Sequence, residues 1–254
     1  MVASIYDGLV GEGFFQQWFG YSCWDAGFVP GLAGGDIPGF IHRKTWMHGV
    51  EHISPTLGAA EETVLFTLIE FLYDHVSKPL TGTLHDYNDC GWHYRTFDKR
   101  LGQERWRDDI NDILKFYDEG FELSKDGQIR RLGEPGLREI MSAKLPANAL
   151  TADREKVDLA VQAYRRGLST KHQRRQAVRE LADVLEPLRK TIKAEMLSKD
   201  ESDLFHIANK FGIRHHNDEQ KSEYDTAWLS WMFYVYLSTI HLIFHLQARK
   251  GPPA

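Results

Sequence analysis

The sequence is poor in cysteine, with only Cys23 and Cys90 among its 254 residues. Two cysteines exclude a disulfide scaffold and are typical of a protein kept in a reducing, cytosolic setting. An excess of either charge is also lacking, since 31 basic and 36 acidic residues give a formal net charge of −5. This balance excludes a protein that coats nucleic acid by charge alone, but it leaves a local basic site open. The opening residues lack a basic segment followed by an apolar run, so we expect no secretory signal.

Glycine is concentrated near the start of the chain, with 11 of the 21 glycines among the first 60 residues. Residues 1–55 also carry many aromatic side chains, which need burial. The combination indicates a compact irregular region rather than a linker, because linkers are polar. A glycine-rich phosphate loop at residues 30–39 is the functional alternative, but no Lys-Ser/Thr pair directly follows its last glycine. We assign no function to this region from the sequence.

Helical periodicity dominates the rest of the chain. Helices are expected at residues 61–77, 102–117, 151–166, 170–185, 200–210 and 224–248, with Pro187 interrupting the fourth and a continuation to about residue 197. Residues 121–132, with Asp126–Gly127 at the turn, predict a short β-hairpin. We therefore expect a mainly α protein with an α+β N-terminal domain at residues 1–148 and a helical domain at residues 149–250.

The last expected helix has no Asp, Glu, Lys or Arg between Asp225 and Arg249. That run is long enough to cross a bilayer. It also contains hydroxyl side chains and two imidazoles, His241 and His245, which are poor groups to face lipid. We expect a buried central helix whose histidines hydrogen-bond within the bundle. A C-terminal membrane anchor is the alternative.

The densest polar cluster lies between the last two expected helices. It contains Asn209, Lys210, Arg214, His215, His216 and Asn217. A histidine that titrates near neutral pH can move a proton, and a neighbouring cation can stabilise the charge of a phosphorane. The residue types therefore fit a site that binds or cleaves a phosphodiester. A solvated loop whose histidines cap helix ends is the alternative.

Several segments together suggest a family. In the C-terminal part they are DESDLFHIANKFGIRHHN at residues 200–217 and YDTAW at residues 224–228. In the N-terminal part they are LFTLIEFLYDHVSKP at residues 65–79, CGWHY at residues 90–94 and GFELSKDGQI at residues 120–129. These segments resemble bacterial abortive-infection proteins of the AbiJ type. The resemblance covers roughly residues 60–246, and its C-terminal part is similar to HEPN domains.

The resemblance implies a HEPN-like helical bundle that acts in antiphage defence as a metal-independent endoribonuclease and toxin. His215 would then be the base on the ribose 2′-hydroxyl, and Arg214 and Lys210 would stabilise the phosphorane. Asn209 and His216 would orient the substrate or protonate the leaving oxygen. The pattern departs from that of active HEPN enzymes, because Asn209 and Lys210 occupy the positions expected for arginine. A catalytically inactive dimerisation or partner-binding module of a defence system is therefore the alternative.

The same resemblance implies a cytoplasmic homodimer, because two facing clusters would supply the acid and the base separately. A second protein of the defence system is a further candidate partner. RNA is the expected substrate, and Arg174, Arg175 and Asn217 are the expected RNA-binding residues. The first two belong to a basic run over residues 171–193, which is otherwise a solvated helix face.

A possible zinc site competes with these assignments. His85, Cys90 and His93 have a spacing that suits zinc ligands, with Asp86 and Asp89 nearby, but a fourth ligand is not obvious. The alternative is a folded loop in which Cys90 and Trp92 are partly buried. From the sequence we expect no metal and no cofactor.

Overall fold

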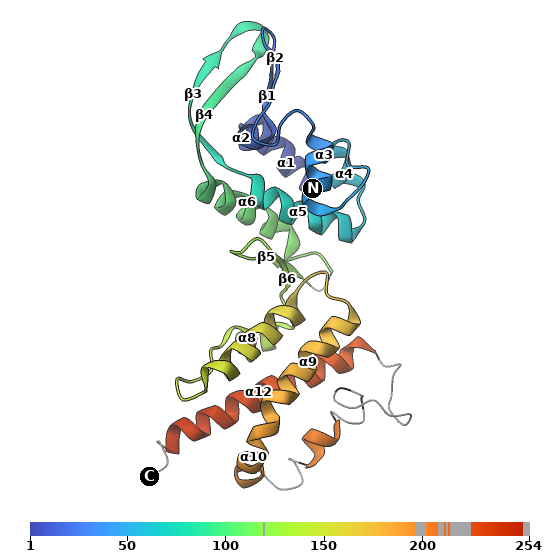
Figure 1. Cartoon of the computed structure of the whole chain (residues 1–254), viewed down its shortest axis with the longest axis vertical. Coiled ribbons are helices and arrows are strands. Elements are labelled where there is room, and N and C mark those ends of the chain that lie inside the picture. Colours follow the sequence, from blue (N-terminus) through green and yellow to red (C-terminus); the bar gives the residue numbers. More distant parts are fainter. Residues whose placement is uncertain (119, 197–201, 208–210, 212, 214–224, 251–254) are drawn as a thin grey trace. The chain divides into compact units, whose positions relative to one another are not determined.

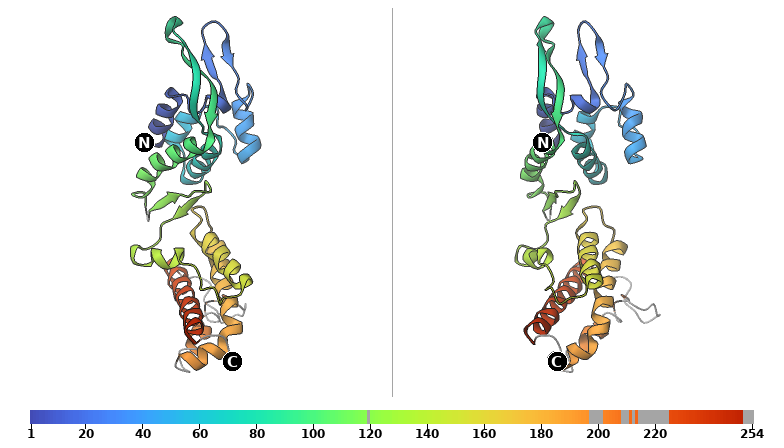
Figure 2. Two further views of the ribbon diagram at one scale, coloured as in Figure 1. Left: turned by 90° about the vertical axis from the view of Figure 1, so that its left-hand side faces the viewer. Right: turned by 60° about the vertical axis from the view of Figure 1, so that its left-hand side comes forward.

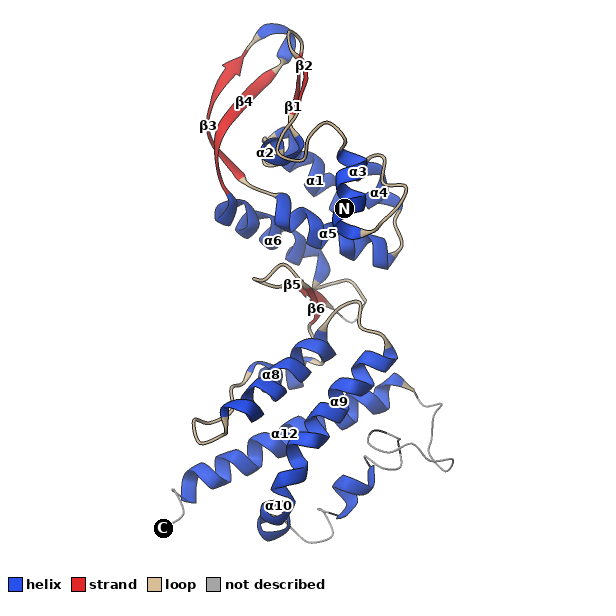
Figure 3. Cartoon of the chain, viewed as in Figure 1, coloured by secondary structure: helices blue, strands red, loops and turns tan. Residues whose placement is uncertain are grey.

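The computed structural model describes residues 1–118, 120–196, 202–207, 211, 213 and 225–250. The chain divides into two compact units, Met1–Arg131 and Leu132–Ala254. Helices predominate, and the described strands form three separate two-stranded antiparallel sheets (Figure 3). The expected mainly α class is thus confirmed.

The N-terminal unit combines helices with all three small sheets (Figure 1). Its elements are α1 (Val2–Gly11), α2 (Gln16–Phe19), β1 (Tyr21–Cys23), β2 (Gly27–Val29), α3 (Ile37–Thr45), α4 (Ile53–Ala59), α5 (Glu62–His75), β3 (Lys78–His85), η1 (Tyr87–Asp89), β4 (Gly91–Asp98), α6 (Lys99–Leu114), β5 (Phe121–Leu123) and β6 (Ile129–Arg131). The Gly- and aromatic-rich start is therefore ordered into short helices and one hairpin.

The core of this unit forms around α5, which presents several fully buried apolar side chains. Trp106 of α6 is also fully buried, and its indole N–H donates to the carbonyl oxygen of Ile69 at 3.1 Å. Helix α6 approaches the end of α5 closely at Gly102, where an added Cβ would lie 2.5 Å from the Cα of Ser77. The expected helices at residues 61–77 and 102–117 correspond to α5 and α6.

The β5–β6 hairpin is fastened to α5 and α6 by polar contacts. Asn111 brackets Leu123, accepting from its N–H at 2.6 Å and donating to its carbonyl at 3.1 Å. Glu70 Oε1 accepts from the backbone N–H of Ile129 at 2.8 Å. At the predicted Asp126–Gly127 turn, Gly127 has φ +79°, which confirms the hairpin predicted from the sequence.

The other two hairpins, β1–β2 and β3–β4, lie side by side (Figure 2). Strand β1 pairs only with β2, and β3 pairs only with β4, among the described strands. In the β3–β4 register, Thr83 pairs with His93 and His85 pairs with Gly91. Because cross-strand partners share a face and alternate residues return to it, His85 and His93 lie on the same face of the hairpin.

The C-terminal unit is helical throughout its described elements. These are η2 (Pro135–Leu137), α7 (Arg138–Ser142), α8 (Thr151–Arg165), α9 (Lys171–Leu185), η3 (Glu186–Leu188), α10 (Arg189–Glu195) and α12 (Thr226–Lys250), and residues 202–207 are also helical. Thr170 caps α9 in a capping box with Gln173, and Pro187 lies in η3 between α9 and α10, both as the sequence predicts.

Helix α12 packs in the core of this unit. Ten of its residues are buried, among them Phe233, whose ring stacks on Tyr164 of α8 at a centroid distance of 3.9 Å. By length and composition alone α12 is able to span a membrane, yet 56% of its most apolar window is buried inside the unit. This burial favours the expected central helix over the alternative of a membrane anchor.

The boundary between the units differs from the expected one after residue 148. It falls between Arg131 and Leu132, so that η2 and α7 belong to the helical unit. The reason is packing, since Met141, Leu145 and Ala149 are part of the helical unit's buried core. In addition, the side-chain amide of Asn148 donates to the carbonyl oxygen of Phe244 in α12 at 3.1 Å.

Candidate functional site

The predicted RNA-cleavage segment lies for the most part outside the described residues. This applies to Asn209, Lys210, Arg214, His215, His216 and Asn217. Two apolar residues of the same segment, Phe211 and Ile213, are described and buried. The Phe211 ring lies 5.1 Å from the Trp228 ring, between centroids. Of this segment, Phe211 and Ile213 thus belong to the core of the helical unit, and Phe211 contacts the start of α12.

Arg174, predicted to bind RNA, is engaged inside the helical unit. Its guanidinium donates to the hydroxyl oxygens of Tyr164 and Ser230 at 2.8 and 3.0 Å, and it lies 4.9 Å from the centre of the Tyr164 ring. The hydroxyl of Tyr164 in turn donates to that of Ser230 at 2.8 Å. These contacts join α8, α9 and α12. Arg175, the second predicted RNA contact on α9, is half-buried.

The remainder of the predicted basic run faces solvent. Its exposed members are Lys171, Arg179, Arg189, Lys190 and Lys193, on α9 and α10. The guanidinium of Arg189 lies 3.5 Å from the carboxylate of Glu186, and this ion pair partly neutralises its charge. We name these five residues the basic face. Arg189 also lies 4.3 Å from the centre of the ring of Phe205, a buried core residue.

The two histidines of α12 have different surroundings. His241 is buried, and its Nε2 has no hydrogen-bond partner among the described residues. Burial lowers the pKa of His241, and the neighbouring His245 lowers it further. His245 is exposed, so the expectation of two core histidines is wrong for this residue. The two rings stack one helical turn apart, at a centroid distance of 6.3 Å.

A second cluster of chemically active side chains lies in the N-terminal unit. The ligand atoms of Cys23, His85, Cys90 and His93 all lie within 4.8 Å of one another. Cys23 ends β1, His85 ends β3, Cys90 follows η1, and His93 lies in β4. The nearest measured pairs are Cys23 Sγ to His85 Nδ1 at 3.7 Å and Cys90 Sγ to His93 Nε2 at 3.2 Å.

The sequence had offered three of these four residues as zinc ligands but not Cys23. Asp86 and Asp89, the residues considered for the fourth position, are exposed. Cys23 lies 62 residues before His85, and no spacing rule connects the two. Only the packing of β1–β2 beside β3–β4 brings them together.

The two thiols have different electrostatic surroundings. Backbone N–H groups of Ala26 and Asp25 donate to Cys23, and the former makes the largest contribution to lowering the pKa of this thiol. Loss of solvation raises the pKa of the Cys90 thiol, although the backbone N–H of Trp24 acts in the opposite direction. The loop after β1 therefore supplies N–H donors to both sulfur atoms.

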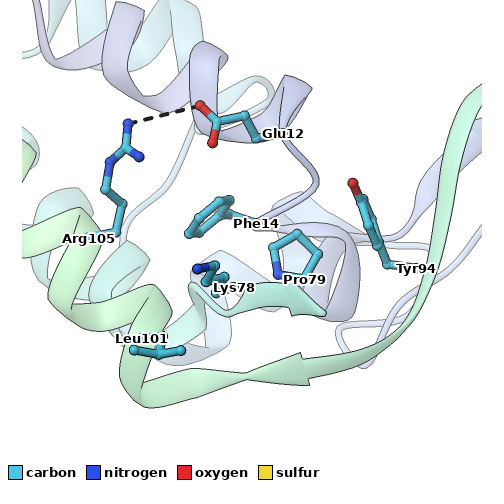
Figure 4. Close-up of a pocket in the computed structure, with 7 residues that line it drawn as sticks. All are labelled: Glu12, Phe14, Lys78, Pro79, Tyr94, Leu101 and Arg105. Carbon is cyan, nitrogen blue, oxygen red and sulfur yellow. Dashed lines mark ion pairs between the residues drawn. The ribbon is translucent and has the colours of Figure 1, made fainter. Parts of the chain in front are cut away.

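A separate pocket of about 470 Å³ opens between α1, β3, β4 and α6 (Figure 4). Glu12 and Arg105 face each other across it at 4.0 Å, while Phe14, Pro79 and Leu101 supply apolar walls. Arg105 also pairs with Asp109 at 2.7 Å, which raises its pKa. The described lining contains no histidine or cysteine, so it provides no group that titrates near neutral pH.

No family model, curated protein or solved structure matches this chain.

Proposed function

We propose that the chain is an antiphage effector that binds RNA through its C-terminal helical unit and cleaves it without a metal. The observation that carries the proposal is the basic face, which places five exposed lysine and arginine side chains on the consecutive helices α9 and α10. An extended row of lysine and arginine side chains suits the phosphates of RNA. The resemblance of residues 200–228 to HEPN-like proteins supplies the chemistry.

In this proposal RNA lies along α9 and α10, and residues 209–217 act on it. His215 takes the proton of a ribose 2′-hydroxyl, and the resulting oxygen attacks the adjacent phosphorus. Arg214 and Lys210 stabilise the phosphorane, and His216 returns a proton to the leaving 5′-oxygen. Asn209 and Asn217 orient the substrate. The products are a cyclic phosphate and a free 5′-hydroxyl.

We further propose that the protein acts as a homodimer in the cytoplasm. The resemblance to HEPN domains, which are often dimeric, supports this part of the proposal. In a dimer, one protomer would supply the acid and the other would supply the base. A second protein of the same defence system would supply the trigger.

A second candidate function is a HEPN-like module that binds a partner and does not cleave RNA. The observation that favours it is the internal engagement of Arg174, which removes one predicted RNA contact from the surface. The presence of Asn209 and Lys210 at the expected arginine positions points the same way.

RNA cleavage by the purified protein separates the two candidates. Wild type, the double variant His215→Ala/His216→Ala and the control His52→Ala, which changes an exposed histidine of the N-terminal unit, are compared with and without EDTA. Cleavage that is lost in the double variant and kept in the control supports the nuclease. If wild type binds RNA without cleaving it, the binding module is favoured.

RNA binding is tested by charge reversal on the basic face. The triple variant Arg179→Glu/Lys190→Glu/Lys193→Glu is compared with Lys44→Glu/Lys99→Glu/Lys125→Glu, which makes the same charge change at exposed residues of the N-terminal unit. For single-stranded RNA, each lost phosphate contact lowers the salt dependence of log K by about 0.7. We expect a decrease of about 2 in that slope for the first variant and none for the second. Equal slopes would refute binding at this face.

A further inference from the structure

We propose that Cys23, His85, Cys90 and His93 bind one structural Zn²⁺ ion that fastens the β1–β2 hairpin to the β3–β4 hairpin. Four potential ligand atoms within 4.8 Å of one another, two sulfurs and two imidazole nitrogens, make a complete Cys₂His₂ set. This inference is independent of RNA cleavage, because it concerns the other unit of the chain.

The distances suit a tetrahedral ion. Zinc lies about 2.3 Å from thiolate sulfur and about 2.0–2.1 Å from imidazole nitrogen, which places sulfur and nitrogen about 3.6 Å apart across a tetrahedron. The two sulfur–nitrogen pairs measure 3.7 Å for Cys23 with His85 and 3.2 Å for Cys90 with His93. These two pairs therefore need shifts of a few tenths of an ångström to hold an ion, and the widest pair of the cluster, within 4.8 Å, must close by up to about 1 Å.

Both imidazoles are held in the orientation that the site requires. The carboxylate of Asp25 lies 3.2 Å from His85 Nε2, which leaves Nδ1 of this ring to face the sulfur of Cys23. A carboxylate on the outer nitrogen of a ligating histidine is the usual outer contact of a zinc site. The ring of Tyr21 stacks on that of His93 at 4.2 Å between centroids, and Nε2 of His93 faces Cys90.

The loop that follows β1 is shaped for thiolates. Backbone N–H groups of Asp25 and Ala26 point at Cys23, and that of Trp24 points at Cys90. Such donors stabilise the negative charge that two metal-bound sulfurs share. Gly27 and Gly91, which follow the two cysteine segments, have φ of +68° and +86°, a conformation that L side chains rarely adopt.

The hairpins have little else to hold them. Among the residues of β1, β2, β3 and β4, only Cys23 is buried. Isolated two-stranded hairpins are marginally stable in water unless they pack on something. Gln16 of α2 supports β4 from one side, since its amide bonds the carbonyl of Trp92 and the N–H of Tyr94. Between the two hairpins themselves, which Figure 2 shows side by side, the cluster is the main connection.

The ligand set identifies the metal and its role. Two thiolates and two imidazoles in a tetrahedral arrangement select zinc over Mg²⁺ or Ca²⁺, which take oxygen ligands. Four protein ligands leave no position for water, so the ion is structural rather than hydrolytic. Loss of RNA cleavage in EDTA would therefore not by itself indicate a catalytic metal.

The first test is the metal content of the full chain, purified under reducing conditions without chelator. We expect one Zn²⁺ per chain by inductively coupled plasma mass spectrometry, and a visible tetrahedral Co²⁺ spectrum with sulfur-to-metal charge transfer after exchange. Cys23→Ser and His93→Ala should each lose the stoichiometric zinc, while His172→Ala retains it. Substoichiometric zinc with no Co²⁺ uptake, or a Cys23–Cys90 disulfide in the intact mass of the freshly purified protein, would overturn the proposal.

A second variant addresses the concern that ligand substitutions simply unfold the hairpins. Asp25→Asn keeps all four ligands but weakens the contact that orients His85. Loss of such an outer contact lowers metal affinity about 10- to 100-fold. We therefore expect Asp25→Asn to bind one zinc in excess metal, with that loss of affinity in a competition titration. An unchanged affinity would overturn the assignment of His85 Nδ1 as a ligand.

Discussion

Replacing Arg174 by methionine tests whether this residue is a structural tie or an RNA contact. Methionine keeps much of the apolar stem and removes the guanidinium. The structure gives that group two hydrogen bonds, to Tyr164 and Ser230, and one ring contact with Tyr164. At about 1 kcal/mol for each hydrogen bond and about 0.5–1 kcal/mol for the ring contact, the variant should lose about 2–3 kcal/mol of stability.

The assay is urea unfolding of the helical unit, with amide hydrogen exchange read by peptide so that the two units are observed separately. For a slope of about 2 kcal/mol per molar urea, the midpoint should fall by about 1–1.5 M. Arg179→Met is the matched control, because it removes an exposed guanidinium from the same helix. Its stability should change by less than about 0.5 kcal/mol.

The reasoning fails if Arg174→Met and Arg179→Met unfold at the same urea concentration. If the two variants are equally stable and only Arg174→Met binds RNA more weakly, Arg174 is an RNA contact, because its guanidinium would then bind phosphate instead of the helical core. A double variant with Ser230→Ala sharpens the result. Because the two side chains share a hydrogen bond, their separate losses should sum to more than the loss of the double variant.

Three further predictions follow from the packing. His241 is buried with a lowered pKa, so the unfolded state takes up a proton at a higher pH than the folded state does. The free energy of unfolding should therefore decrease as the pH falls below about 6.5. Urea midpoints at several pH values should show this decrease in wild type and a weaker one in His241→Phe. Gly102→Ala should lower the free energy of unfolding by about 1–3 kcal/mol, because the added Cβ would clash with the Cα of Ser77. The control Gly58→Ala in α4 adds a Cβ that meets no other atom, so it should not destabilise the protein in thermal unfolding. Trp106→Ala should cost about 3–5 kcal/mol by chemical denaturation, and an unchanged midpoint would refute its place at the centre of the core.

Local chemistry explains which parts of the fold were predictable. The Thr170 cap, the Asp126–Gly127 turn and the interruption at Pro187 depend on a few adjacent residues, and each lies where the sequence placed it. The division between the compact units lies earlier in the chain than the expected domain boundary, because the segment before α8 has few regular features and its membership depends on contacts of residues such as Met141 with the distant α12.

The candidate sites were harder to predict because their partners are distant in the chain. A basic run on α9 is visible in the sequence, but the engagement of Arg174 depends on Ser230, 56 residues later. The zinc-ligand spacing of His85, Cys90 and His93 is likewise visible, whereas Cys23 comes from another hairpin. His245 was misplaced for a different reason: an uncharged helix gives little indication of which side meets the solvent.

The separation of Cys23 from His85 by 62 residues has a consequence for biosynthesis. At translation rates of about 5–20 residues per second, roughly 3–12 s pass between the synthesis of the first ligand and that of the second. During that interval the β1–β2 hairpin has neither its metal nor its neighbouring hairpin, and its thiol is open to oxidation. The availability of zinc and of reducing capacity around the ribosome would then govern how much of the protein reaches its finished N-terminal unit.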